Sequence, residues 1–493
     1  MACTQSDEVS AASSKKPIRF AIAQAPLNLD PRYATDAASE RVNRLLYRSL
    51  VDFDAQSKPV PQLARWQRVS PTQYRFTLIE KEFQKFHHGK PLTAHDVAAT
   101  YASFAQMKNS PHSAEFSNID SIKVRDAASL DFHLKIPDPQ FAAKLIIGIL
   151  PADLIAAGHD FSHQPVGSGP LKFFAWDNTL TLQRIADGQL ITLSEVRDPT
   201  VRVLKLIRGE ADILQGDLPP ELVKYLQTQD RIKVATSVGS NFSYLGLNLQ
   251  DPALKNPLVR QAIAHAIDRQ AIIKQVLVPG SREAAAILPP EHYTNQSSYV
   301  ANDYDPALAK ALLQKAGIQL PLKLVYKTST DAQRVRLATI MQAQMREAGI
   351  ALEIRSLDWG TFFEEVKQGN FQLFGLTWVG IKTPEIYAKA FGSDQLPPKG
   401  FNRGKFIDPE LDSLIQTAML QSDEENKAWQ AVTQHIHAQL PYIPLWYEGQ
   451  FVAMRNDIQA YAPKADGNWD DFMRIKRADI QDSDIEVTIN HAH

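Results

Sequence analysis

The chain has 493 residues, with 53 Lys and Arg against 55 Asp and Glu, so its formal net charge is −2. This balance argues against a nucleic-acid-binding protein, which normally carries a strong basic excess. Hydrophobic residues make up 44% and charged residues 22% of the chain, which is typical of a globular protein and excludes a largely disordered one. At about 150 residues per domain, the length favours about three domains.

No segment is apolar for long enough to cross a bilayer. The best candidate, residues 141–158, is interrupted by Lys144, Pro151 and Asp153, whereas a membrane helix needs about 20 predominantly apolar residues. Cys3 is the only cysteine, which rules out an internal disulfide and argues against a cysteine nucleophile in a folded core.

Cys3 is followed by a stretch of small and polar residues that extends to Lys16. This arrangement resembles the N-terminus of a bacterial lipoprotein whose signal peptide has been removed. It predicts that Cys3 carries a lipid and that residues 1–16 form a flexible tether. The alternative is an ordinary cysteine near a disordered N-terminus.

Local patterns predict several elements before the middle of the chain. Residues 18–22 have the composition of a strand. Thr93, with Asp96 three residues later, matches a capping box and predicts a helix that begins there. Asn256 followed by Pro257 predicts the start of a further helix, because asparagine caps helices and proline suits their first turn.

The segment 322–378 contains five predicted elements in a regular order. Met341 and Met345 lie on one face of its first helix and are expected to be core residues, and Gly349 stands where that helix should end. Alternation of strands and helices predicts a parallel sheet with right-handed crossovers. The elements are strand 322–326, helix 335–348, strand 350–354, helix 362–367 and strand 371–377.

Parallel sheets bind ligands beyond the carboxyl ends of their strands. Three segments fall at such ends, namely 327–329, 358–360 and 378–381. Two of them contain a tryptophan, Trp359 or Trp378, and this pair predicts a surface on which a ligand stacks. The alternative is that both indoles are buried between domains.

Signatures of catalysis and of metal binding are not found in the sequence. There is no His-Glu-x-x-His, no Gly-x-Ser-x-Gly and no P-loop. Among the 13 histidines, none forms a spacing that brings donors together; His87, His435 and His437 are the nominal candidates. We therefore expect no enzyme activity, no cofactor and no bound metal.

Four sequence blocks occur in a characteristic order and spacing. They are residues 46–52 with 61–64 and 83–97, residues 165–173, residues 244–248 with 259–263 and 266–269, and residues 441–446. Within the first block, Phe-Gln-Lys-Phe-His-His-Gly-Lys-Pro-Leu-Thr-Ala-His-Asp-Val is the most specific phrase. Together they resemble the dipeptide, oligopeptide and nickel family, called family 5, of extracytoplasmic solute-binding proteins of ABC transporters.

The resemblance implies an α/β protein with a two-lobed, three-domain fold of the periplasmic binding protein type (class II), with mixed and parallel sheets and a hinged cleft. Asn241 and Phe451 mark the expected hinges, where the chain passes between lobes. The implied division is a core domain of lobe 1 (17–44 with 169–243 and 453–493), an inserted domain of lobe 1 (45–168) and a lobe 2 domain (244–452).

The resemblance also implies that Trp359 and Trp378 line pockets for ligand side chains, with Gly380 in the segment that follows. Peptide binders of the family carry an aspartate for the peptide's α-amino group, and dipeptide binders an arginine for its carboxylate. The matching positions here are Ile381 and Thr328. Loss of such a charge-assisted bond costs roughly 1.5–3 kcal/mol, so an ordinary free dipeptide is not the expected ligand.

Four further residues are expected to contact the ligand. Asn241, Tyr244 and Asn402 would supply polar contacts, while Glu448 stands where peptide binders carry a tyrosine near the cleft. If Glu448 points inward it holds a cationic group; the alternative is a solvated carboxylate in a loop.

The resemblance implies a monomeric, periplasmic or lipid-anchored protein that captures a small organic solute or peptide-like ligand by lobe closure and delivers it to the permease of an ABC importer. Two other functions stay open at this point. One is a carrier of a metal chelate or haem on the same scaffold. The other is an enzyme that uses the carboxylate of Glu448.

Overall fold

The computed structural model describes residues 15–79, 85–107, 109–295, 301–398, 400–420 and 426–478. Cys3 and most of the predicted tether lie outside these residues, so the lipid anchor stays a prediction. Within the described ranges, no helix is both long enough and apolar enough to span a membrane.

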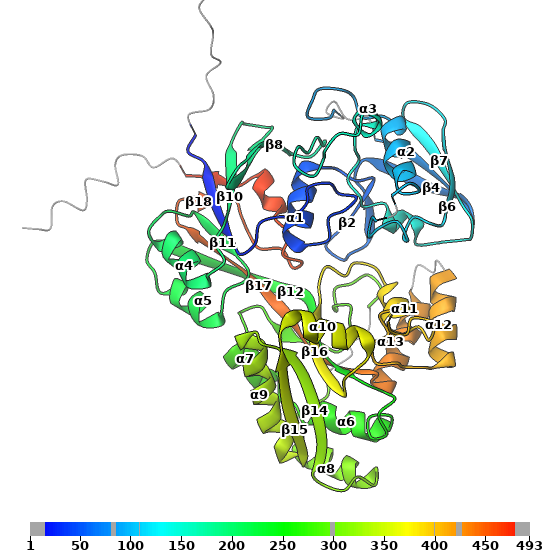
Figure 1. Ribbon diagram of the computed structural model, residues 1–493, viewed down its shortest axis with the longest axis vertical. Coiled ribbons are helices and arrows are strands. Elements are labelled where there is room, and N and C mark those ends of the chain that lie inside the picture. The colour runs from blue at the N-terminus through cyan, green and yellow to red at the C-terminus, as the bar shows by residue number, and fades with distance from the viewer. Residues whose placement is uncertain are drawn as a thin grey trace, which may run out of the picture.

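A large mixed sheet forms the centre of the molecule (Figure 1). Among the described residues it has eleven strands, in the order β15-β14-β16-β12-β17-β11-β1-β10-β9-β8, with β13 paired to β17. Its strands are β1 (Ile18–Ile22), β8 (Leu171–Trp176), β9 (Thr179–Arg184), β10 (Leu190–Glu195), β11 (Ile213–Gln215), β12 (Ile232–Leu247), β13 (Arg282–Glu283), β14 (Leu322–Ser329), β15 (Ile350–Leu357), β16 (Leu373–Trp378) and β17 (Tyr442–Arg455).

Two long antiparallel strands, β12 and β17, cross the middle of the molecule (Figure 1). They join an upper part, defined here as residues 15–231 and 456–478, to a lower part, residues 248–441. The ladder between them is interrupted between Ser237 and Asn241. Gly239 lies in this interruption, where its backbone comes so close to β17 that an added Cβ would lie 1.5 Å from the backbone oxygen of Glu448.

The upper part combines one end of the large sheet with a smaller antiparallel sheet. The smaller sheet has the order β4-β5-β7-β6 and is covered by α2, whose start at the predicted Thr93 is confirmed by a 2.8 Å bond from the Thr93 N–H to the carboxylate of Asp96. The further elements of this part are α1 (Ala37–Leu46), β2 (Val51–Phe53), β3 (Pro59–Pro61), β4 (Ala64–Ser70), β5 (Gln73–Leu78), α2 (Ala94–Ser103), β6 (Ile119–Val124), β7 (Ser129–Leu134), η1 (Phe141–Lys144), α3 (Ala152–Ala156), α4 (Pro199–Ile207), α5 (Pro220–Gln227), β18 (Ile458–Gln459), η2 (Asp470–Met473) and β19 (Lys476–Arg477).

The lower part contains the predicted parallel strands and has its own hydrophobic core. β14 pairs in parallel with both β15 and β16, as predicted, and Met341 and Met345 are buried in the core. The sheet is not parallel throughout, because β16 also pairs antiparallel with β12. The helices are α6 (Pro257–His265), α7 (Arg269–Val276), α8 (Pro306–Lys315), α9 (Ala332–Glu347), α10 (Trp359–Gln368), α11 (Ile386–Phe391), α12 (Pro409–Leu420) and α13 (Lys427–Gln439).

One predicted boundary was wrong in a way that affects the site. The helix expected from residue 362 begins at Trp359, because Asp358 caps it and accepts a hydrogen bond from the Thr361 N–H at 3.1 Å. Asp358 and Trp359 therefore belong to a helix start and not to a free loop at the strand end.

The upper and lower parts also contact each other directly, beyond the two crossing strands. The Lys144 ammonium lies 2.8 Å from the carboxylate of Glu385, and the Lys382 ammonium lies 2.6 Å from that of Asp466. These two ion pairs join the upper and lower parts outside the paired strands β12 and β17.

Candidate functional site

A cavity of about 380 Å³ lies beside the crossing strands and is lined by both parts of the molecule. We call it the crossing cavity. Arg41 and Asp217 line it from the upper part, Arg334 from the start of α9 in the lower part, and Asn241 and Glu448 from β12 and β17. Its volume is within the usual range of pockets for small organic ligands, about 300–1,000 Å³.

Glu448 lies in the strand β17, not in a loop, and lines this cavity. One of its carboxylate oxygens accepts hydrogen bonds from the hydroxyls of Ser243, at 2.6 Å, and Thr377, at 2.9 Å. The guanidinium of Arg334 lies 3.8 Å from the same oxygen. The carboxylate is therefore held in place by neighbours on three elements while part of it stays accessible to a cavity occupant.

Asn241 faces the same cavity and has an unsatisfied acceptor. The residue is 8% exposed, and its Oδ1 atom is buried with no hydrogen-bond partner in the structure. A buried polar group without a partner costs about 1–3 kcal/mol. A donor on an occupant of the cavity would remove this cost, so Asn241 is suited to receive a ligand N–H or O–H.

The cavity contains charges of both signs. Arg334 donates to the Thr377 hydroxyl at 3.0 Å, and the guanidinium of Arg41 stacks over the ring of Trp469 at 5.5 Å. Asp217 and Asp331 line the same cavity as these two cations. A ligand with both an ammonium and a carboxylate therefore finds opposite charges for each group.

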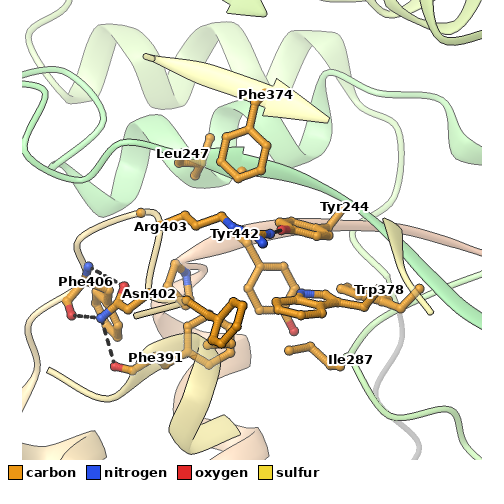
Figure 2. Close-up of a pocket in the computed structure, with 16 residues that line it drawn as sticks. Tyr244, Leu247, Ile287, Phe374, Trp378, Phe391, Asn402, Arg403, Phe406 and Tyr442 are labelled. Carbon is orange, nitrogen blue, oxygen red and sulfur yellow. Dashed lines mark hydrogen bonds between the residues drawn. The ribbon is translucent and has the colours of Figure 1, made fainter. Parts of the chain in front are cut away.

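A second, aromatic pocket lies on the other face of β12 and β16. Side chains alternate between faces along a strand, so Ser243 and Thr377 point to the crossing cavity while Tyr244 and Trp378 point away from it. The rings of Tyr244 and Trp378 are 6.4 Å apart and 12° from parallel. Figure 2 shows the guanidinium of Arg403 beside them, and it donates to the Tyr244 hydroxyl at 3.1 Å.

Trp359 and Trp378 do not meet in one pocket. Trp359 is 57% exposed at the start of α10 and stacks on Phe363, with ring centroids 5.4 Å apart. Trp378 is half-buried and lines the aromatic pocket. The alternative of two buried indoles is thus wrong for Trp359, and a common stacking surface for both is not assembled in this conformation.

The remaining predicted residues differ in how far a ligand can reach them. Gly380 is exposed with φ of +70°, and Ile381 packs partly against the lower core. Thr328 is fully buried. Asn402 is 1% exposed, and its amide nitrogen donates to the carbonyl oxygens of Phe391, Gly392 and Phe406. The predicted ligand contact through Asn402 is therefore corrected, because this side chain holds its own loop.

The nominal metal ligands do not converge. His87 in the upper part bonds the Gly169 carbonyl at 3.1 Å, and His435 on α13 in the lower part bonds Asp408 at 2.7 Å. His437 is two residues from His435 on the same helix. Throughout the described ranges, no group of three or more His, Cys, Asp or Glu is placed to hold a metal ion.

His292 is buried in the lower part, and its burial leads to a prediction of how the stability of the fold depends on pH. The Thr294 N–H donates to its Nδ1 at 3.2 Å, and its Nε2 lies 2.9 Å from the Lys382 carbonyl, so Nε2 carries the proton of a neutral ring. Burial lowers the pKa of His292 to about 4. In the unfolded chain the histidine has a pKa near 6.5, so it binds a proton at a higher pH than in the folded protein. The free energy of unfolding therefore decreases as the pH falls from about 6.5 to about 4.

We expect urea unfolding to show a smaller loss of stability between pH 7 and pH 4.5 in His292→Gln than in the unmodified protein. The difference should be about 2 kcal/mol, because each pH unit in that window contributes about 1.4 kcal/mol. Exposed His88 provides the control, because His88→Gln makes the same chemical change at the surface. Equal pH dependence in His292→Gln and the unmodified protein would contradict the role assigned to His292.

Sequence reasoning missed Arg41, Arg334, Asp217 and Arg403. Arg334 had a usable signal, since it directly precedes the predicted helix 335–348, which follows a predicted strand at the edge where ligands bind. Asp217 has φ of +53° in a short turn, and its place in the cavity depends on the packing of distant segments. No local pattern in the sequence points to Arg41 or Arg403.

Comparisons with known proteins identify the family of this chain. The sequence profile of the bacterial extracellular solute-binding proteins, family 5 (middle), matches residues 58–395. The chain belongs to this family. The family consists of solute-binding proteins rather than enzymes, and its members act outside the cytoplasm.

Relatives of this family 5 protein span nearly its whole length. Di/tripeptide-binding protein 2 of Pseudomonas aeruginosa is 26% identical, over 95% of this chain and 96% of its own. The glutathione-binding protein GsiB of Pectobacterium atrosepticum is also 26% identical, over 89% of each chain. The solved structure of the oligopeptide-binding protein AppA from Bacillus subtilis in complex with a nonapeptide has 23% identity, a TM-score of 0.75, and coverage of 94% of this chain and 99% of that one. This likeness confirms the predicted α/β fold of the periplasmic binding protein type.

Proposed function

We propose that this protein is the substrate-binding component of an ABC importer and that it captures a peptide-like solute with a free α-amino group in the crossing cavity. The observation that carries the proposal is the composition of that cavity. Both parts of the molecule line it, and it contains a fixed carboxylate, two guanidinium groups and an unpartnered amide oxygen.

Glu448 replaces the carboxylate that the family's peptide binders carry three residues after the second tryptophan. Ile381 offers no charge at that position, but the Glu448 carboxylate is already oriented by Ser243 and Thr377. An ammonium that binds there forms a charge-assisted hydrogen bond at an oriented acceptor. Glu448 thus supplies the negative charge for the α-amino group that Ile381 does not provide.

Arg41 and Arg334 hold the carboxylate end of the solute in this proposal. They belong to different parts of the molecule, so a solute that bridges them stabilises the conformation in which the two parts are close. A ligand shifts such an equilibrium only through contacts that differ between the open and closed states. The hinges would lie near Asn241 and Phe451, and the lobes would follow the boundaries 17–44 with 169–243 and 453–493, 45–168, and 244–452.

In this proposal the solute is delivered unchanged to a permease, as expected for a member of a family of solute-binding proteins. Relatives are named for di- and tripeptides and for glutathione, and these compounds share a free α-amino group and a carboxylate. The protein would work as a monomer outside the cytoplasm, with Cys3 as a lipid anchor.

The test is calorimetric titration with di- and tripeptides, glutathione and the N-acetylated form of each compound that binds. We expect at least one free compound to bind and to raise the melting temperature, because a ligand that binds only the folded state stabilises it. Acetylation should weaken binding by about tenfold or more, since it removes the charge that meets Glu448. Equal affinity for free and acetylated compounds, or no binding across the panel, would overturn the proposal.

A further inference from the structure

Arg403 differs from the other buried arginines of the lower part. Arg260 and Arg269 each direct four hydrogen bonds to backbone carbonyls. Arg403 is 9% exposed, but in the described part of the chain its guanidinium makes one hydrogen bond, to the Tyr244 hydroxyl at 3.1 Å, and no ion pair. A buried charge is normally paired, so Arg403 has donors that the described fold does not use.

The surroundings of Arg403 orient the guanidinium without neutralising it. Its central carbon lies 5.1 Å from the ring centroid of Trp378, 5.5 Å from that of Phe363 and 5.8 Å from that of Phe401. Burial raises the pKa of the Tyr244 hydroxyl, so this phenol is neutral at physiological pH. The rings attract the cation by their negative faces, and no carboxylate of the described residues pairs with it.

The space beside Arg403 fits a small anionic group. The aromatic pocket encloses about 30 Å³, and a water-sized group needs about 10–15 Å³. The pocket therefore has room for about two water-sized groups. A guanidinium donates to both oxygens of a carboxylate at once, in a geometry that a neutral amide cannot reproduce.

The aromatic pocket and the crossing cavity lie on opposite faces of the same end of β16. Trp378 is the last residue of β16. The next residue, Val379, is 52% exposed, and Phe401, which lines the aromatic pocket, is 46% exposed. Thr377, the residue before Trp378, bonds the Glu448 carboxylate. A solute that binds Glu448 therefore has to pass the end of β16 for one of its side chains to enter the aromatic pocket.

We infer that Arg403 is a specificity-determining residue that selects solutes with an acidic side chain, whose carboxylate enters the aromatic pocket beside Trp378. This inference rests on the proposed function, since it assigns a subsite to the same ligand. The inferred substrates are anionic peptide-like solutes. One carboxylate binds Arg41 and Arg334 in the crossing cavity, and a second, from an acidic side chain, binds Arg403.

The test compares tripeptides that differ only in one side chain, with Glu or Gln at each of the three positions and Ala elsewhere. For one position, the unmodified protein should bind the Glu peptide about tenfold or more tightly than the Gln peptide. Arg403→Met keeps an apolar side chain of similar length for the surrounding rings and should abolish this preference, while the affinity for the Gln peptide changes less than threefold. Arg403→Lys should retain only part of the preference.

A second measurement does not depend on the folding of a variant. As the pH falls through about 4.3, the ordinary pKa of glutamate, the Glu peptide should lose its advantage over the Gln peptide in the unmodified protein. The inference is overturned, with the proposed function intact, if Glu and Gln peptides bind the unmodified protein equally or if folded Arg403→Met keeps the preference. If neither peptide binds at any position, the proposed function fails and the inference fails with it.

Discussion

Glu448→Gln is expected to weaken the binding of a solute with a free α-amino group by about 10- to 100-fold. This range corresponds to a charge-assisted hydrogen bond of about 1.5–3 kcal/mol. Glutamine keeps an oxygen that accepts from Ser243 and Thr377, as the carboxylate does at 2.6 and 2.9 Å, so the fold should be retained. The measurement is calorimetric titration with the best compound of the peptide panel.

The matched control is Glu364→Gln, at an exposed carboxylate on α10 whose partner is Lys367. This variant makes the same chemical change away from the crossing cavity, and its affinity for the peptide should equal that of the unmodified protein. The N-acetylated peptide should bind Glu448→Gln and the unmodified protein with similar affinity, because the charge on the ligand is already absent. An unchanged dissociation constant for the free peptide in Glu448→Gln would contradict the role given to this carboxylate.

Gly239→Ala is expected to cost about 3 kcal/mol of unfolding free energy. An added Cβ at this position would lie 1.5 Å from the Glu448 backbone oxygen and 2.5 Å from its carbonyl carbon. The obstruction is backbone, which no side-chain rotation can relieve, and forced overpacking typically costs about 1–3 kcal/mol, occasionally more. Urea unfolding of the ligand-free protein measures the effect directly.

Gly360→Ala makes the identical change where the nearest atom belongs to a side chain and not to the backbone. Its added Cβ would meet only the Asp358 side chain, at 3.3 Å, in the first turn of α10. Alanine is also the better helix former by about 1 kcal/mol, so this variant should be as stable as the unmodified protein or slightly more stable. If Gly239→Ala unfolds at the same urea concentration as Gly360→Ala, the close approach of β12 and β17 at Gly239 does not contribute to stability as predicted.

Much of the lower part could be predicted because its elements are defined locally. Apolar spacing and Gly349 predicted the helix that became α9, and strand–helix alternation predicted the parallel pairing of β14 with β15 and β16. The antiparallel pairing of β16 with β12 could not be predicted this way. The paired residues are more than a hundred positions apart, so no local sequence pattern includes both of them.

The candidate site was predicted only in part, for the same reason. Asn241 and Glu448 were named from the sequence, and both line the crossing cavity. Arg41 reaches the cavity through the packing of the upper part, and Arg403 reaches the aromatic pocket from a loop that Asn402 holds in place. Long-range packing places these side chains, so their roles become visible only in three dimensions.

The continuity of β12 and β17 has a consequence for any attempt to divide the molecule. One end of each strand belongs to the lower core, which contains Leu245 and Ile443, and the other end belongs to the upper cores, which contain Ile232 and Val452. A gene fragment that encodes either half alone would lack strands in the centre of its own sheet. Excised halves should therefore aggregate on expression, while the intact chain should unfold in a single cooperative transition.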